Sequence, residues 1–394
     1  MMPANMAAPR RRALVFFRDD SSLHVARLLA DDLATCGWDT DFAWVDYAEQ
    51  GRPLLSARQL EVGLRGAKVT YGFTPYDDFR SDLLKRYDAV FSAKFSAHFR
   101  RRVERRQWRF LRKRPCFVAL SPGLEFTPES GLVARSVFDV VCTDTEANAA
   151  YLRGREKPGG EGRGPAVVRY NPLFVRRRGT GASGAIRKIV FFTQSASPCA
   201  LESRRSVARL LRDVASAHPD KELVIKLRHL STENRNHTHV EAWGYQDLLA
   251  AEGPLPKNMC FEHGSMESIL DSADLAVTCT STAGVEALAK GVRTVFFLSF
   301  DRSETDPLVD KMRVFLEGSG SIVDCDQIVA LDLPTLTDDW LNATLLGGDA
   351  VRDMIAAIDA VDVESGIGPA NWLRGAAADL MELARSVWRS LRRP

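Results

Sequence analysis

Residues 271–297 read DSADLAVTCTSTAGVEALAKGVRTVFF and predict a strand, a helix and a second strand. The first strand is the apolar run at 275–279, the helix ends near Gly291, and the second strand covers 294–298. Three hydroxyl-bearing residues, 280–282, join the first strand to the helix. Strands joined by a helix in this way run parallel in one sheet, so this stretch predicts an α/β protein.

The hydroxyl-rich turn is a candidate anion site. The first backbone N–H groups of a helix have no partner within it, and the helix dipole favours negative charge there. Ser281 and Thr282 stand at this predicted helix start. The alternative is that either hydroxyl only caps the helix, as in many α/β proteins.

A second group of candidate ligands lies upstream, in residues 222–229, ELVIKLRH. This short stretch predicts a strand that delivers Lys226, Arg228 and His229 at its carboxyl end. Ligands of open parallel sheets bind at the carboxyl ends of strands, so we expect both segments to face one crevice. Two cations and an imidazole beside a helix start suit a diphosphate or a phosphodiester. The alternative is a solvated strand end, with His229 satisfied inside its loop.

The composition is that of a soluble globular protein. The 394 residues are 45% apolar and 26% charged, and the length suits two domains. No apolar stretch approaches the length of a membrane span, and the apolar run after the first arginines is too short for a signal peptide. Seven cysteines without a C-x-x-C pair favour a reducing compartment and argue against a zinc site. We expect a cytoplasmic location.

A strongly basic run interrupts this balanced composition. From Arg100 to Arg114 the chain reads RRRVERRQWRFLRKR, nine cations against the single acid Glu104. Three interpretations stay open: a solvated outer helix, a surface that docks on an anionic membrane, and a site for a polyanionic acceptor. No motif for DNA or RNA recognition accompanies the run, so nucleic acid is not expected as a partner.

Strand and helix patterns alternate along nearly the whole chain, which predicts parallel sheets with helices on both faces. The polar, Gly-rich stretch RRRGTGASG at 176–184 is the best candidate for a domain linker. We therefore expect a first domain at 1–178, a second at 186–350 and a helical tail at 351–394.

The two polar segments also carry a family resemblance. A strand that ends in Lys-x-His-Pro, followed by a Ser-Ser turn, resembles the nucleotide-binding half of GT-B glycosyltransferases, above all bacterial capsule, teichoic-acid and sialic-acid or Kdo transferases. Here KLRH and Thr280-Ser281-Thr282 occupy these places, and Leu230 stands where the proline is usual. The resemblance covers residues 189–300. It implies two Rossmann-like domains facing a cleft, a first for the acceptor and a second for the nucleotide sugar, with C-terminal helices returning to the first.

The resemblance also implies which residues hold the donor. In this fold a glutamate near Glu286 binds the ribose hydroxyls, and a loop like the one at His263 cradles the base. The loop after the first strand of the second domain faces the cleft. The expected nucleotide-binding residues are Lys226, Arg228, His229, Thr193, Gln194, Ser195, His263, Ser281, Thr282, Gly284 and Glu286.

Inverting glycosyl transfer needs a general base for the acceptor hydroxyl and a group that stabilises the leaving phosphate. In the sialyl- and Kdo-transferase families an acidic pair before a glycine supplies the base. Here Ser121 and Pro122 replace that pair before Gly123. The candidate bases are Glu125 and Glu129 after this place, and Asp19 and Asp20 after the first strand.

His229 is the candidate for the leaving group, because an imidazolium beside Lys226 and Arg228 neutralises a departing phosphate. This assignment makes the reaction metal-independent. No Asp-x-Asp triplet of the kind that holds a divalent ion against a sugar nucleotide is present, and His237 and His239 lack further ligands at a convincing spacing. No cofactor is expected besides the nucleotide-sugar donor.

The leading hypothesis is an inverting glycosyltransferase that acts on a surface glycan, glycolipid or polymer at the cytoplasmic face of the membrane. A CMP-activated ulosonic acid is the preferred donor, because a histidine with a Ser/Thr turn is the signature of that group; UDP- and GDP-sugars stay open. Two alternatives use the same scaffold, a UDP-sugar epimerase and a CDP-polyol phosphotransferase. A third is a non-catalytic subunit that binds nucleotide or glycan in a glycan-assembly complex.

Overall fold

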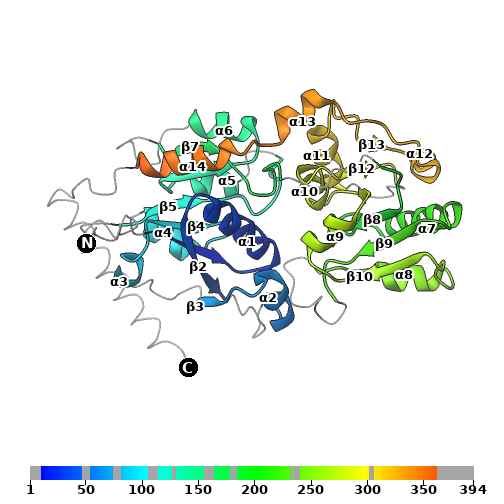
Figure 1. The fold of residues 1–394 in the computed structure, drawn as a ribbon, viewed down its shortest axis with the longest axis horizontal. Coiled ribbons are helices and arrows are strands. Elements are labelled where there is room, and N and C mark those ends of the chain that lie inside the picture. The colour runs from blue at the N-terminus through cyan, green and yellow to red at the C-terminus, as the bar shows by residue number, and fades with distance from the viewer. Residues whose placement is uncertain are drawn as a thin grey trace, which may run out of the picture.

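The computed structural model describes residues 10–46, 54–73, 81–104, 114–126, 130–154, 164–177, 184–230, 233, 240–300 and 306–361 (Figure 1). Two α/β domains lie side by side, each built around one parallel sheet. The predicted α/β class with two Rossmann-like domains is therefore confirmed.

The first domain contains a parallel sheet with the strand order β3-β2-β1-β4-β5-β6-β7. Its elements in chain order are β1 (Arg11–Phe17), α1 (Asp20–Thr35), β2 (Trp38–Val45), α2 (Ala57–Leu64), β3 (Val69–Phe73), α3 (Ser81–Leu84), β4 (Ala89–Ser92), α4 (Ala97–Glu104), β5 (Cys116–Ala119), α5 (Ser130–Arg135), β6 (Val140–Thr143), α6 (Glu146–Arg153) and β7 (Ala166–Arg169).

The second domain contains a parallel sheet with the order β10-β9-β8-β11-β12-β13. Its elements are β8 (Lys188–Phe192), α7 (Leu201–Ala217), β9 (Glu222–Lys226), α8 (Tyr245–Ala251), β10 (Met259–Glu262), α9 (Met266–Ser272), β11 (Leu275–Thr278), α10 (Ala283–Ala289), β12 (Arg293–Phe297), α11 (Pro307–Phe315), β13 (Ile322–Val323), α12 (Cys325–Ala330) and α13 (Asp338–Thr344).

Both sheets reverse their strand order beside their first strand. In the first domain the chain moves outward from β1 to β3 and then restarts on the other side at β4; the second domain repeats this pattern from β8 to β10 and then β11. Such a reversal leaves a crevice at the carboxyl ends of the central strands, which is where open α/β sheets bind ligands. The fold therefore places one candidate site in each sheet.

Alternate residues of the central strands are buried on opposite faces. Along β1, Val15 and Phe17 join one apolar core, while Leu14 and Phe16 join another. A parallel sheet covered on both faces needs such a continuous apolar run, and RRALVFF supplies it.

The end of the described chain returns to the first domain. Helix α14 (Asp349–Asp359) packs against β6 and β7, and Figure 1 shows it beside β7. Asp359 forms an ion pair with Arg11 of β1 at 2.6 Å. This confirms the expected return of a C-terminal helix to the first domain; the tail from residue 362 on lies outside the described residues.

The basic run is described only at its two ends. Helix α4 holds its beginning, with Phe99 and Val103 in the core of the first domain. Residues 105–113 lie outside the described part of the chain. Arg114 donates to both carboxylate oxygens of Asp139, at 2.6 and 3.0 Å, and so belongs to the domain's own structure. Within the described ranges, every helix is too short or too polar to cross a membrane.

Candidate functional site

A cleft of about 630 Å³ lies between the two domains, at the carboxyl edges of their sheets. The first domain lines it with the start of α1, with α2, with Lys94 and with residues 122–126. The second domain lines it with the ends of β8 and β9, the loop 263–266 and the turn 280–283. The segments around Lys226 and Ser281, which the sequence predicted to share one crevice, do share it.

Lys226 and Arg228 form the cationic part of the second-domain wall. Lys226 is the last residue of β9, and its Nζ donates to the carbonyl oxygen of Leu227 at 2.6 Å. Burial and the nearby Arg58 lower the pKa of Lys226 to about 8. The charged form of Lys226 is therefore only weakly stabilised in this structure, and a bound anionic ligand would stabilise that form.

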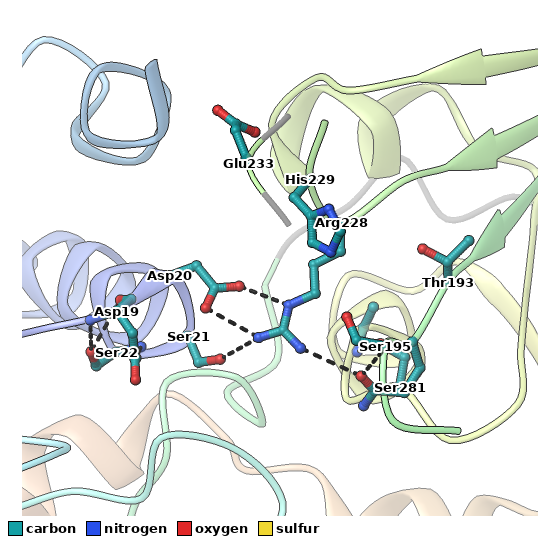
Figure 2. Close-up of polar contacts among 12 residues, drawn as sticks. Asp19, Asp20, Ser21, Ser22, Thr193, Ser195, Arg228, His229, Glu233 and Ser281 are labelled. Atoms are coloured by element: carbon teal, nitrogen blue, oxygen red, sulfur yellow. Dashed lines mark hydrogen bonds and ion pairs between the residues drawn. The ribbon is translucent and has the colours of Figure 1, made fainter. Parts of the chain in front are cut away.

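Arg228 reaches across the cleft to the first domain (Figure 2). Its Nε and Nη2 donate to the two carboxylate oxygens of Asp20, at 2.8 and 3.1 Å, and Nη2 also donates to Ser21 Oγ at 3.1 Å. Its Nη1 lies 3.4 Å from Gln194 Oε1. This guanidinium thus bridges the start of α1 and the loop after β8.

His229 does not line the cleft. It is 5% exposed, and its Nδ1 lies 3.1 Å from the carbonyl oxygen of Leu230. Strand β9 ends at Lys226, and in the bend that follows it Arg228 lines the cleft while His229 does not. The place beside Lys226 that the sequence analysis gave to the imidazole is held by the guanidinium of Arg228.

The loop after β8 contributes Thr193 and Gln194 to the cleft wall. Thr193 Oγ1 donates to the carbonyl oxygen of Lys226 at 3.1 Å, and Gln194 Oε1 accepts from the backbone N–H of Ser195 at 2.8 Å. Ser195 itself lies behind the wall, with its hydroxyl buried and without a partner among the described residues.

Arg204, which the sequence analysis missed, fixes this loop from behind. Its side chain is 1% exposed, and its Nη2 donates to the carbonyl oxygens of Gln194 and Ser195 at 2.7 and 2.6 Å. Its other N–H groups bind Pro198 O, Trp243 O and the carboxylate of Glu241. A buried guanidinium with carbonyl partners on every side holds the loop in one conformation.

The turn after β11 presents hydroxyls to the cleft, as predicted. Thr280, Ser281 and Thr282 all line it, and Thr280 Oγ1 is buried without a partner among the described residues. Ser281 Oγ accepts from the N–H of Ala283 at 3.2 Å. Helix α10 has only 7 residues, and Thr282 makes no side-chain cap bond. The hydroxyls and nearby cations, more than a long helix dipole, therefore define this wall.

Gly284 has a packing role. A Cβ atom at this position would lie 2.7 Å from the ring of Phe296 and 2.9 Å from Thr278 Cγ2. Only glycine lets α10 approach the sheet this closely. Gly284 lies outside the cleft wall, in contrast to the nucleotide contact expected for it.

Glu286 and His263 do line the cleft. Glu286 Oε2 lies 2.8 Å from Nε2 of His24, on helix α1 of the first domain. Burial opposes ionisation of Glu286, but His24, Lys290 and Arg177 together outweigh it, and the pKa of this carboxylate is lowered. Burial and the charges of Lys226 and Arg58 lower the pKa of His263, which favours a neutral ring.

The candidate bases from the sequence occupy different surroundings. Glu125 lines the cleft, and Nη1 of the buried Arg135 lies 2.5 and 2.6 Å from its two carboxylate oxygens. Asp19 lies outside the cleft wall; it is 1% exposed, caps α1 and accepts from Lys94 Nζ at 2.6 Å. Glu129 lies outside the described residues.

His24 was not among the residues expected from the sequence, although the sequence contains a signal for it. It lies four residues beyond Asp20, one turn into the helix that follows β1. That helix starts at the point where the strand order of the first sheet reverses, which is where ligands bind. Its side chain is 26% exposed.

A second bridge across the domains holds the loop after Arg228. Glu233 accepts from Arg58 Nε and Nη2 at 2.9 and 2.5 Å, and from Ser56 Oγ at 2.6 Å. It also accepts from the N–H of Leu230 at 3.0 Å. Burial alone would raise its pKa, but the bonds from Arg58 and Ser56 dominate and lower the pKa of Glu233 to about 2.

This bridge predicts an acid-sensitive contribution to stability. Because the pKa of Glu233 is lower in the fold than its ordinary value of 4.5, its contribution is complete above pH 4.5 and is lost as the pH falls towards 2. We expect the difference in Tm between the unmodified protein and Glu233→Gln to be larger at pH 6 than at pH 3. For Arg58→Met, too, the difference in Tm from the unmodified protein should be larger at pH 6 than at pH 3. Equal differences at both pH values would contradict the prediction.

Comparisons with known proteins agree with this architecture. The family model described as "Putative glycosyltransferase (DUF6716)" matches residues 14–361. No curated protein sequence matches the chain. Among similar solved structures is a "putative UDP-N-acetylglucosamine 2-epimerase" from Listeria monocytogenes, with 11% identity over 92% of this chain and 99% of that chain and a TM-score of 0.53. UDP-GlcNAc 2-epimerase from Methanocaldococcus jannaschii shows 10% identity over 88% of this chain and 99% of that chain, with a TM-score of 0.53. UDP-GlcNAc 2-epimerase from Neisseria meningitidis bound to UDP-GlcNAc shows 11% identity over 89% of this chain and 100% of that chain, with a TM-score of 0.51.

These similarities at such low identity show a shared fold, two Rossmann-like domains that face a cleft. The GT-B architecture expected from the sequence is thereby confirmed.

Proposed function

This chain belongs to the glycosyltransferase family DUF6716, and from that premise we propose that it transfers a sugar, with inversion, from a nucleotide donor in the interdomain cleft to an acceptor hydroxyl. The observation that carries the proposal is the composition of the cleft. Lys226 and Arg228 face it from the second domain, and the imidazole ring of His24 faces it from the first. Cations on one wall and a base on the other are what this reaction needs.

The two cations would stabilise the leaving phosphate. As the bond between the sugar and the phosphate breaks, negative charge builds on the phosphate oxygens, and fixed cations in a partly buried cleft lower the energy of that state. Arg228 offers a planar fork that matches phosphate oxygens, and Lys226 offers a point charge. Thr280 adds a buried hydroxyl at the same wall. In this proposal no step passes through a metal ion.

His24 is the base that we propose for the acceptor hydroxyl. With Nε2–H donating to Glu286, the lone pair of Nδ1 is the one that can take a proton, and the carboxylate then stabilises the imidazolium. Glu125 and Asp19 are weaker candidates, because each carboxylate is held by a cation, Arg135 or Lys94. Because Glu125 lines the first-domain side of the cleft, it can still contact the acceptor there.

The donor that suits this wall best is a nucleoside diphosphate sugar. The preference for a CMP-ulosonic acid depended on a histidine beside Lys226, and the cleft carries Arg228 there instead. A guanidinium and an ammonium together suit the greater charge of a diphosphate. The Neisseria protein is described with bound UDP-GlcNAc, which makes UDP-sugars the first donors to test and keeps CMP- and GDP-sugars as alternatives.

The acceptor that we propose is a surface glycan, glycolipid or polymer. The charged run from Arg100 to Arg114 suits an anionic membrane surface at which such an acceptor is presented. We expect the protein to sediment with phosphatidylglycerol vesicles but not with neutral vesicles. A vesicle sedimentation assay tests this part of the proposal.

A donor panel tests the function. Purified protein is incubated with UDP-, GDP- and CMP-sugars with water as the acceptor, while nucleotide release is followed by chromatography and the released sugar by NMR. The proposal expects release from one donor class with inversion at the anomeric carbon. A 2-epimer without nucleotide release would favour the epimerase alternative, for which the similar folds are the supporting observation. Nucleotide binding without any turnover would favour the non-catalytic subunit.

A further inference from the structure

The donor site of this protein already contains an anion of its own. The carboxylate of Asp20 accepts two hydrogen bonds from the fork of Arg228, at 2.8 and 3.1 Å, in the geometry that a phosphate would use (Figure 2). Ser21 Oγ accepts a third at 3.1 Å. Asp20 and Ser21 belong to the first domain and Arg228 to the second, so the contact crosses the cleft.

We propose that Asp20 is a specificity-determining residue of the donor site, an internal competitor that occupies Arg228 until a phosphate group displaces it. The inference deepens the proposed function, since it takes the cleft to be a nucleotide-sugar site. Asp20, Ser21 and Arg228 all line that cleft.

The competition follows from the geometry of the guanidinium. Nε and Nη2 form the edge that faces Asp20, and a second oxyanion cannot use that edge at the same time. The side chains of Arg228 and Asp20 are 20% and 23% exposed, so water and salt screen their attraction only in part. A ligand that needs this edge therefore binds with an apparent affinity reduced by the fraction of molecules in which Asp20 holds it.

The exchange discriminates between ligands. A nucleoside monophosphate or diphosphate carries more negative charge than one carboxylate and can replace Asp20 on Arg228. Lys226 lies close enough to this pair for both partners to act on its pKa. A nucleoside without phosphate cannot replace it and gains nothing from either cation. Asp20 thus lowers the affinity for phosphorylated ligands and leaves that for the bare nucleoside unchanged.

The exchange also changes how the domains are joined. When a phosphate takes Arg228, Asp20 and Ser21 at the start of α1 both lose their contact with the second domain. The contacts between His24 and Glu286 and between Arg58 and Glu233 do not involve Arg228. Donor binding then frees Asp20 and Ser21 at the wall that faces the acceptor.

Calorimetric titration of Asp20→Asn with UDP, UMP and uridine tests the inference. The amide has the same size as the carboxylate but no charge, so we expect UDP and UMP to bind about five- to tenfold more tightly and uridine to bind as before. In an Arg228→Met background, Asp20→Asn should produce no further gain. Glu146→Gln, which removes one negative charge from the surface helix α6, controls for the change in net charge and should leave all three affinities unchanged. Asp20→Ala provides a second variant if the amide disturbs the start of α1.

The outcomes separate this inference from the proposed function. If UDP binds the unmodified protein and both Asp20 variants with equal affinity, the competitor role is wrong and the donor site stands. If Asp20→Asn still raises the affinity for UDP and UMP in the Arg228→Met background, long-range charge explains the increase. The proposed displacement of Asp20 from Arg228 by phosphate is then wrong. If neither the unmodified protein nor any Asp20 variant binds a nucleotide, the proposed function fails first and this inference with it.

Discussion

His24→Ala is expected to lower kcat for glycosyl transfer by roughly 10²- to 10⁴-fold, the usual contribution of a positioned general base. The ring lies in the cleft, and its Nε2 is 2.8 Å from Glu286 Oε2, so the pair has a base and a group that orients it. The affinity for the nucleotide alone should change little, because the phosphate ligands lie on other residues. Steady-state kinetics with the active donor, together with titration of the nucleotide product, measure both quantities.

Two further variants make the result specific to His24. Glu286→Gln keeps the size of the carboxylate but weakens its hold on an imidazolium, so kcat should fall by less than in His24→Ala. His218→Gln replaces a histidine that contacts Val329 O, far from the cleft lining, and should leave kcat unchanged. A His24→Ala enzyme with normal kcat would move the role of base to Glu125.

Lys226→Met is expected to weaken nucleotide binding by about 10- to 100-fold and, at the same time, to make the protein more stable. The pKa of Lys226 is lowered to about 8 by burial and by Arg58, so the charged side chain has a higher free energy in the fold than in water. A methionine of similar length removes that charge. We expect the free energy of unfolding at pH 7 to rise by about 1–3 kcal/mol.

The gain in stability should depend on pH in a defined direction. Below pH 8 Lys226 is charged in both the folded and the unfolded chain, and the variant has its full advantage. Between pH 8 and 10.5 the unfolded chain binds more protons than the folded one, so the unmodified protein gains stability and the advantage of Lys226→Met shrinks. Denaturant unfolding at pH 7 and pH 9.5 measures this. Lys257→Met, at an exposed lysine outside the cleft lining, is the control and should show neither effect.

The sequence predicted the scaffold well because the scaffold is encoded locally. Apolar runs such as RRALVFF and LAVT form buried parallel strands almost wherever they occur between helical patterns, and the carboxyl ends of such strands share one edge. That rule alone was enough to bring Lys226 and the turn 280–282 into one cleft. The return of a C-terminal helix to the first domain was implied by the resemblance to GT-B glycosyltransferases.

The roles of single side chains were harder to predict because they depend on direction and on distant partners. His229 and Arg228 are neighbours in sequence, yet in the bend that follows β9 His229 is buried and Arg228 lines the cleft. Gly284 resembled a ligand position but is required by the ring of Phe296, from another strand. The partner of His24 is Glu286, which lies 262 residues away in the sequence, and no local sequence pattern predicts such a contact.

The most direct test of the central claim is calorimetric titration of the unmodified protein and of Arg228→Met with UDP, GDP, CDP and CMP. The structure predicts that one of these nucleotides binds the unmodified protein selectively and that Arg228→Met loses most of that affinity. Selective CMP binding would keep the site and restore the ulosonic-acid donor. Absence of binding by all four, or equal binding by Arg228→Met, would contradict the assignment of this cleft as the nucleotide site.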